Sequence, residues 1–107
     1  MVESVIMGDL RAALNYCGYD LDEVMGTKSR KRIYSDLRSI VWSIYCREQK
    51  VTPGQASRAF GWNRATIFCS IGRVQGLRQS DKVYSDMYDS INGAYMAYSN
   101  REEAAGE

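Results

Sequence analysis

Apolar residues in this chain recur with the period of an α-helix, and this periodicity constrains the fold more than any other feature. The 107 residues include one proline, Pro53, and few runs in which apolar and polar residues alternate as in a strand. Spacings of three and four residues instead place apolar side chains on one helical face. The clearest case is a segment running to about residue 49, with apolar positions at Ile33, Leu37, Ile40, Val41, Ile44 and Tyr45. The pattern predicts an all-α fold.

Helix stop signals divide the chain into five substantial helices and one short helical turn. Gly18 is expected to end the first helix, and Gly26 is expected to follow the short turn, whose first residues are acidic. Residues 1–100 are expected to form one domain, whereas the polar and acidic residues 101–107 are expected to be a disordered tail.

The composition excludes most kinds of enzyme site. The sequence has no histidine, so it lacks the base of a Ser-His or Cys-His pair and the histidine ligands of common zinc sites. It also contains no GxxxxGK[ST] phosphate-binding loop. We therefore expect no enzymatic activity, no metal, no cofactor and no small-molecule substrate.

Cysteine usage is typical of a reduced, cytoplasmic protein. Cys17, Cys46 and Cys69 lie far apart and form no CxxC pair, so each is expected to be a small buried side chain. No apolar run approaches the roughly 18 residues that a membrane span needs. The segment from Met1 to Met7 lacks the pattern of a signal peptide. We expect a cytoplasmic location and no membrane partner.

Charge is distributed unevenly along the chain, although the net charge is only +1. Residues 1–25 carry a net charge of −4, residues 26–82 carry +9, and residues 83–107 carry −4. The basic middle contains the loop Lys28-Ser29-Arg30-Lys31-Arg32, whose cations could neutralise phosphates while Ser29 donates a hydrogen bond. The pattern favours one surface that faces a polyanion. A solvated helical surface remains the alternative.

Residues 55–74 have the spacing of a helix-turn-helix. Thr52 and Gln55 can form a capping box that starts a short helix, Gly61 suits its end, and Asn63 can cap the next helix. The apolar face of that second helix is expected to contain Ile67, Phe68, Ile71 and Val74. An ordinary αα-hairpin with a polar cap is the alternative.

The start of the second helix carries side chains that suit the edges of bases. Arg64 could donate two hydrogen bonds to guanine, Asn63 could pair with adenine, and Thr66 could contact a thymine methyl group or a phosphate.

The sequence resembles the C-terminal DNA-binding domain of the bacterial replication initiator DnaA over about residues 5–92. That family has a short helix ending in a Tyr-Gly-like step, then a small helix, and then a Lys-Ser-Arg-Lys-Arg loop. The corresponding segments here are 16–18, 21–25 and 28–32, and an arginine of the family's long helix corresponds to Arg38.

The family signature Phe-Gly, Arg, Asp/Asn-His, Thr/Ala-Thr also has counterparts after Phe60. Asn63 falls on the Asp/Asn position and Thr66 on the second Thr, while Ala65 is an accepted variant. Two departures matter, because Arg64 replaces the signature His and Trp62 replaces the preceding Arg. The resemblance implies duplex binding more than it implies binding to the initiator's usual sequence.

We therefore predict a bundle of five to six helices that contains a helix-turn-helix, similar to the DnaA C-terminal domain and to the Trp repressor. Its expected function is non-enzymatic binding of double-stranded DNA in replication initiation or transcription control of a phage or mobile element. The expected DNA-binding residues are Lys28, Ser29, Arg30, Lys31, Arg38, Thr52, Gln55, Asn63, Arg64, Ala65, Thr66 and Arg73.

Other partners remain open at this point. The alternative function is a helical protein-interaction module that keeps the fold but has lost specific DNA binding. A homodimer contact through an exposed part of the tyrosine stripe at residues 84–98, or a contact with a replication protein, is also compatible with the sequence.

Overall fold

The structure, a computed structural model, describes residues 4–27, 29 and 31–106, with side chains as far as residue 100. Within these ranges the ordered elements are helices and no strand is present, which confirms the all-α prediction. The six helices are α1 (Val5–Tyr16), α2 (Leu21–Gly26), α3 (Arg32–Gln49), α4 (Pro53–Phe60), α5 (Arg64–Ser80) and α6 (Lys82–Gly106).

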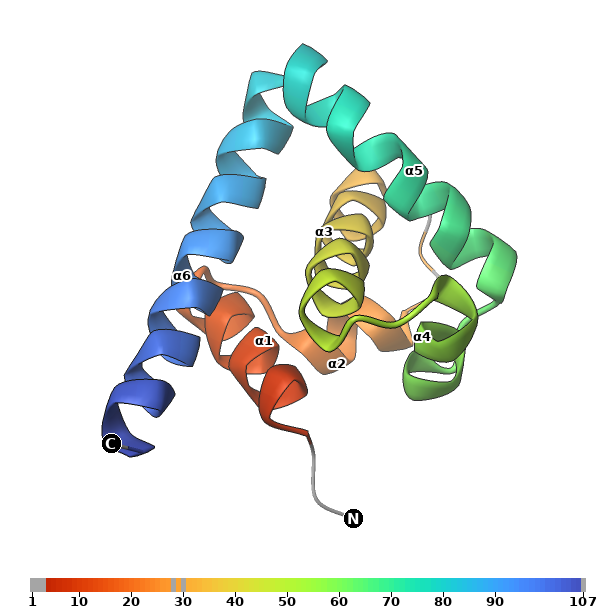
Figure 1. The fold of residues 1–107 in the computed structure, drawn as a ribbon. Helices are drawn as coiled ribbons and strands as arrows, with labels where there is room; N and C mark the ends of the chain where they lie inside the picture. The colour runs from red at the N-terminus through yellow and green to blue at the C-terminus, as the bar shows by residue number, and fades with distance from the viewer. Residues whose placement is uncertain (1–3, 28, 30, 107) are drawn as a thin grey trace.

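Helix α3 runs through the middle of the molecule and the other helices surround it (Figure 1). Helix α1 packs along α6, while α5 packs on α3 and α4. Helices α5 and α6 meet at a corner, so that α4 with the start of α5 lies on one side and α1 with the far half of α6 lies on the other (Figure 1). The fold thus presents two well-separated surfaces.

The helix boundaries follow from local capping chemistry. The side chain of Asp20 accepts a hydrogen bond from the Glu23 amide at 2.9 Å, which caps α2. Gly18 and Gly61 adopt φ values of +92° and +69°, a left-handed conformation that costs glycine little and that ends α1 and α4. These two helix ends are where the sequence predicts them.

The core is built from aliphatic residues and fully buried aromatic rings. Trp42, Tyr84 and Tyr95 are the largest fully buried side chains in it. The Tyr84 hydroxyl shares a hydrogen bond of 2.8 Å with Ser39, which satisfies two buried hydroxyl groups between α3 and α6.

Three side chains are more exposed than the periodicity predicts. Phe68 is 67% exposed, because α5 turns the positions of Ile67, Ser70 and Val74 toward the core and leaves Phe68 on the solvent side. Cys69 is exposed for the same reason, so its predicted burial is wrong. Ile33, in the first turn of α3, is also largely exposed.

The other two cysteines lie at the edge of the core. Cys17 and Cys46 are partly buried, and burial raises the pKa of each thiol. A raised pKa leaves less thiolate at neutral pH, which predicts slow reaction of both thiols.

Helix α6 continues to Gly106 in the structure, into the segment 101–107 that the composition predicts to be disordered. Alanine and glutamate, which dominate this segment, favour a helix. The side chains of 101–107 lie outside the described residues, and the disorder of the segment stays a prediction. None of the helices in the described part of the chain is long and apolar enough to cross a membrane.

Buried Tyr95 makes stability sensitive to alkaline pH. Burial, followed by the nearby carboxylates of Glu48 and Asp9, raises the pKa of Tyr95 to about 12. Between about pH 10 and 12 the unfolded chain releases this proton and the folded chain keeps it, so the stability present below pH 10 is lost. The free energy of unfolding of the unsubstituted protein should therefore fall over this pH range. We predict that it falls by about 2 kcal/mol less in Tyr95→Phe, which lacks the titrating hydroxyl. Urea titrations across this pH range measure it, and parallel curves for the two proteins would contradict it.

Candidate nucleic-acid interface

Helices α4 and α5, joined by the turn at Gly61–Asn63, form a unit that we call the α4–α5 unit (residues 53–80). Thr52 and Gln55 form the predicted capping box at its start, where Thr52 Oγ1 accepts from the Gln55 amide at 3.3 Å and Gln55 Oε1 accepts from the Thr52 amide at 2.9 Å. Ala56 of α4 and Ile67 of α5 are fully buried between the helices and α3. The unit is therefore anchored at its start and along its inner face.

Asn63 acts as the N-cap of α5. Its Oδ1 accepts from the Ala65 amide at 2.8 Å and from the Thr66 amide at 3.4 Å. A bidentate contact to adenine would need this same oxygen. Asn63 therefore holds the first turn of α5 in place, and the contact to adenine predicted from sequence would compete with the cap.

Arg64, Ala65 and Thr66 are all exposed in the first turn of α5. The aliphatic part of Arg64 lies against α4, because a Cβ atom added to Gly54 would stand 3.2 Å from Arg64 Cδ and 3.7 Å from Thr52 Oγ1. The bare backbone of Gly54 thus leaves room for the Arg64 side chain beside the α4 cap. The structure brings Arg64, Thr52 and Gln55 to the same end of the α4–α5 unit.

Arg38 does not lie where a phosphate could reach it. Its side chain is only 7% exposed, and its guanidinium donates to the backbone carbonyls of Val24 at 2.9 Å, Thr27 at 2.5 Å and Ser29 at 3.5 Å. Burial lowers the pKa of Arg38, yet a guanidinium remains charged at neutral pH. Arg38 therefore holds the segment between α2 and α3 and is not a phosphate contact in this structure.

Trp62 connects this segment to the α4–α5 unit. The Arg38 guanidinium lies 4.6 Å from the centre of the Trp62 ring, and Trp62 Nε1 donates to the Met25 carbonyl at 2.8 Å. Trp62 also contacts the core, since its ring meets the ring of Trp42 edge to face, with 5.5 Å between the ring centres. We call this arrangement of Arg38 and Trp62 on the carbonyls of residues 24–29 the Arg38–Trp62 clamp.

The clamp fixes the start of the basic loop. The Ser29 amide donates to Thr27 Oγ1 at 3.1 Å, and the Lys31 amide donates to Ser29 Oγ at 3.2 Å, so a chain of local hydrogen bonds leads into α3. Ser29 Oγ accepts in this arrangement, which leaves its proton available to a phosphate, and Lys31 is exposed. Two predicted contacts, Lys28 and Arg30, lie outside the described residues.

Arg73 lies further along α5 and faces the start of α3. It is exposed, and its positive charge, together with that of Arg32, opposes the rise that burial causes in the pKa of Asp36. Its charge is therefore partly offset by a carboxylate, unlike that of Arg64 at the other end of the helix.

The outer face of α5 carries small and apolar residues, and of these only Ala65 is predicted from the sequence to belong to the interface. Ala65, Cys69, Gly72 and Gly76 are exposed along it, beside the exposed Phe68 ring. Because these side chains are short, the wall of a DNA groove could come close to the backbone of α5. A helical wheel of α5 with Ile67 and Val74 facing the core predicts this exposed face, because Phe68 then points outward.

The described residues contain no group of three or more Cys, Asp or Glu side chains that could hold a metal ion. Comparison with protein-family models, with curated protein sequences and with solved structures gives no match for this chain.

The clamp predicts that Arg38 controls the order of the basic loop. In Arg38→Met the carbonyls of residues 24–29 lose a charged donor, so the Ser29 and Lys31 amides should exchange with deuterium about tenfold faster, or more, while α6 amides keep their protection. Trp62→Phe removes the indole donor and part of the ring but keeps an aromatic face for Arg38, and it should produce a smaller change in the same amides. Exchange measured by NMR tests both variants. Arg58→Met, on the exposed side of α4, is the control, and unchanged exchange at Ser29 and Lys31 would contradict the prediction.

Proposed function

We propose that the protein binds double-stranded DNA through a helix-turn-helix formed by the α4–α5 unit and through the basic loop, without covalent chemistry. The observation that carries the proposal is the Arg38–Trp62 clamp, which ties the loop to the turn that starts α5. A buried arginine and a tryptophan are a costly way to hold a solvated loop, but an effective way to hold cations beside a recognition helix. The resemblance to the DnaA C-terminal domain, with its Trp-repressor-like helical bundle, supports the same function.

In this proposal the base contacts come from the start and the outer face of α5. Arg64 supplies a fork of donors for guanine, and Ala65, Thr66 and Phe68 supply apolar contacts for thymine methyl groups. The small residues Gly72 and Gly76 let the helix lie close to the walls of the major groove. Asn63 acts through its cap, so that it sets the angle of the first turn instead of reading a base.

The phosphate contacts come from both ends of the interface. Ser29 and Lys31, with Lys28 and Arg30 beside them in the sequence, face one strand of the duplex. At the start of α4 the side chains of Thr52 and Gln55 are occupied by the capping box, so a contact there would use the backbone amide of Gly54. Arg73 adds a weaker contact, because Asp36 offsets its charge.

The second candidate function is a protein-interaction module that keeps the fold without specific DNA binding. The exposed Phe68 ring on a smooth helix favours this alternative, because such a face also suits a helix of a partner protein. Replication initiation, transcription control of a phage or mobile element and a cytoplasmic location belong to the first proposal. The two candidates differ in how binding depends on salt.

We predict that duplex binding weakens steeply with salt. If about five phosphates are neutralised, the slope of log affinity against log salt concentration is roughly −4 to −5. Fluorescence anisotropy with a random-sequence duplex between low and moderate salt measures this slope. A flat dependence, or no binding at low salt, would favour the protein-interaction module.

We also predict that Arg64→Ala and Lys31→Ala have different effects. A duplex site is first selected from random sequences, and both variants are then titrated against that site and a scrambled one. Arg64→Ala should cost roughly 1–3 kcal/mol at one base position and relax the preference there. Lys31→Ala should weaken both duplexes equally and make the salt slope shallower by roughly 1. Equal, sequence-independent losses in the two variants would mean that Arg64 contacts no base.

A further inference from the structure

Three neighbouring hollows form a groove that begins between α1 and α6 and continues past α2 to the start of α3. Helices α1 and α6 pack on each other on the side of the molecule away from α4 (Figure 1). The first part of the groove is a hollow of about 430 Å³ between Tyr16 of α1 and Gly93, Ala94, Ala97 and Tyr98 of α6. A second hollow of about 380 Å³ shares Tyr16 with the first, and a third of about 470 Å³ shares Tyr19 with the second. The three hollows therefore follow one another around the end of α1 and along the start of α2.

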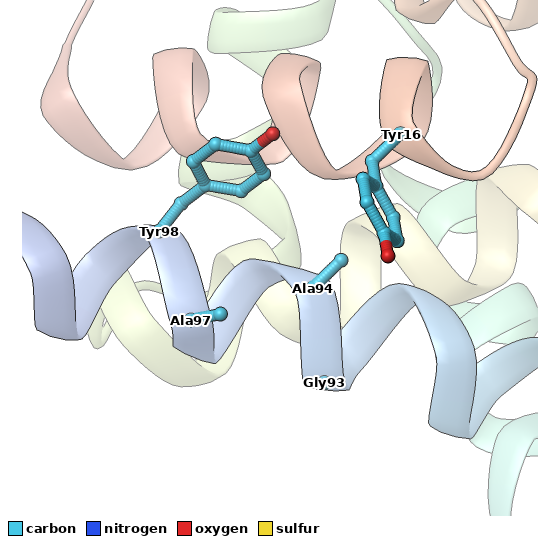
Figure 2. A pocket seen from close by; sticks show the side chains of 5 residues that line it. All are labelled: Tyr16, Gly93, Ala94, Ala97 and Tyr98. Atoms are coloured by element: carbon cyan, nitrogen blue, oxygen red, sulfur yellow. The ribbon is translucent and has the colours of Figure 1, made fainter.

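The first hollow has aromatic walls and a floor of small residues. Figure 2 shows Tyr16 pointing from α1 toward α6 and Tyr98 pointing from α6 toward α1, with Ala94 between them. Tyr16 is 77% exposed, so a large ring stands in solvent beside Gly93 and Ala97. Exposed aromatic rings next to a depression of small residues are typical of a site that receives an apolar side chain.

The charges along the groove have one sign. Asp86 lines the second hollow, and Asp20 and Glu23 line the third, whereas no lysine or arginine is among the described residues that line any of the three. Lys82 contacts Asp86 at 3.1 Å, but both side chains are largely exposed, so solvent screens this pair. The groove is thus complementary to a cation.

We propose that this groove binds an amphipathic helix of another protein, with large apolar side chains on one face and lysine or arginine beside them. The apolar face would fill the hollows on both sides of Tyr16, and the cations would lie near Asp86, Asp20 and Glu23. A second copy docked through the same face is a poor occupant, because it would bring one acidic surface against another. The two hollows beside Tyr16 lie away from the α4–α5 unit, whereas the third hollow reaches Ile33 and Tyr34, directly after the basic loop.

A selection from a phage-displayed library of random peptides of about 16 residues tests the proposal. Peptides enriched on the full-length protein should combine large apolar residues at helical spacing with lysine or arginine. Binding of the synthesised peptides, measured by calorimetry, should weaken by about tenfold or more in Ala97→Lys, which places a cation and a long side chain in the first hollow. Gln79→Lys, at an exposed position of α5, is the matched control and should leave binding unchanged.

Three results would overturn the proposal: no enriched peptide, enriched peptides that are acidic, or peptide binding that Ala97→Lys leaves intact. A concentration-dependent dimer that Ala97→Lys abolishes, measured by light scattering, would assign the groove to a second copy and would also overturn it. Duplex affinity is measured on the same variants. Because the groove and the α4–α5 unit are separate, loss of one kind of binding does not imply loss of the other.

Discussion

The structure depends on one buried guanidinium. Arg38 projects from the central helix α3, donates to three backbone carbonyls at the end of α2 and in the following segment, and stacks on Trp62. Each charged hydrogen bond contributes about 1.5–3 kcal/mol, and a desolvated cation–π contact about 2 kcal/mol. Without this side chain the three carbonyls would lose their charged donor, and the segment that leads into the basic loop would be tied to the turn before α5 through the Trp62–Met25 hydrogen bond alone.

The Arg38–Trp62 clamp explains why the basic loop and the capped start of α5 form one surface. The basic loop and the capped start of α5 are far apart in sequence, and each could occur alone in an ordinary helical protein. Trp62 stands in the turn before α5 and binds the Met25 carbonyl, so the turn and the loop share a common support. The groove beside Tyr16 begins on a different surface, between α1 and α6.

The helices and their caps could be predicted because they depend on local sequence. Gly18, the Thr52–Gln55 capping box and the Asn63 cap depend on neighbours within a few residues, and the structure has them as predicted. The roles of Arg38 and Trp62 could not be predicted in this way, because their partners are distant in sequence.

The exposed face of α5 could be predicted from the sequence only in part. The sequence predicts Phe68 on the apolar face with Ile67, Ile71 and Val74, but neighbouring residues on a helix point about 100° apart, and Phe68 is exposed while Ile67 is buried. Its hydrophobicity alone gave the wrong orientation, and the burial of the small polar Ser70 decided which face of α5 turns inward. The apolar periodicity of a helix predicts its buried face less reliably when a polar residue such as Ser70 belongs to that face.

The most direct test of this account is a double-mutant cycle between Trp62→Phe and Lys31→Ala, measured as affinity for a duplex site. If the clamp holds the basic loop against DNA, part of the effect of Trp62 acts through Lys31. The loss in the double variant should then be smaller than the sum of the single losses by more than about 0.5 kcal/mol. Additive losses would show that the turn and the loop act independently, and would contradict the account.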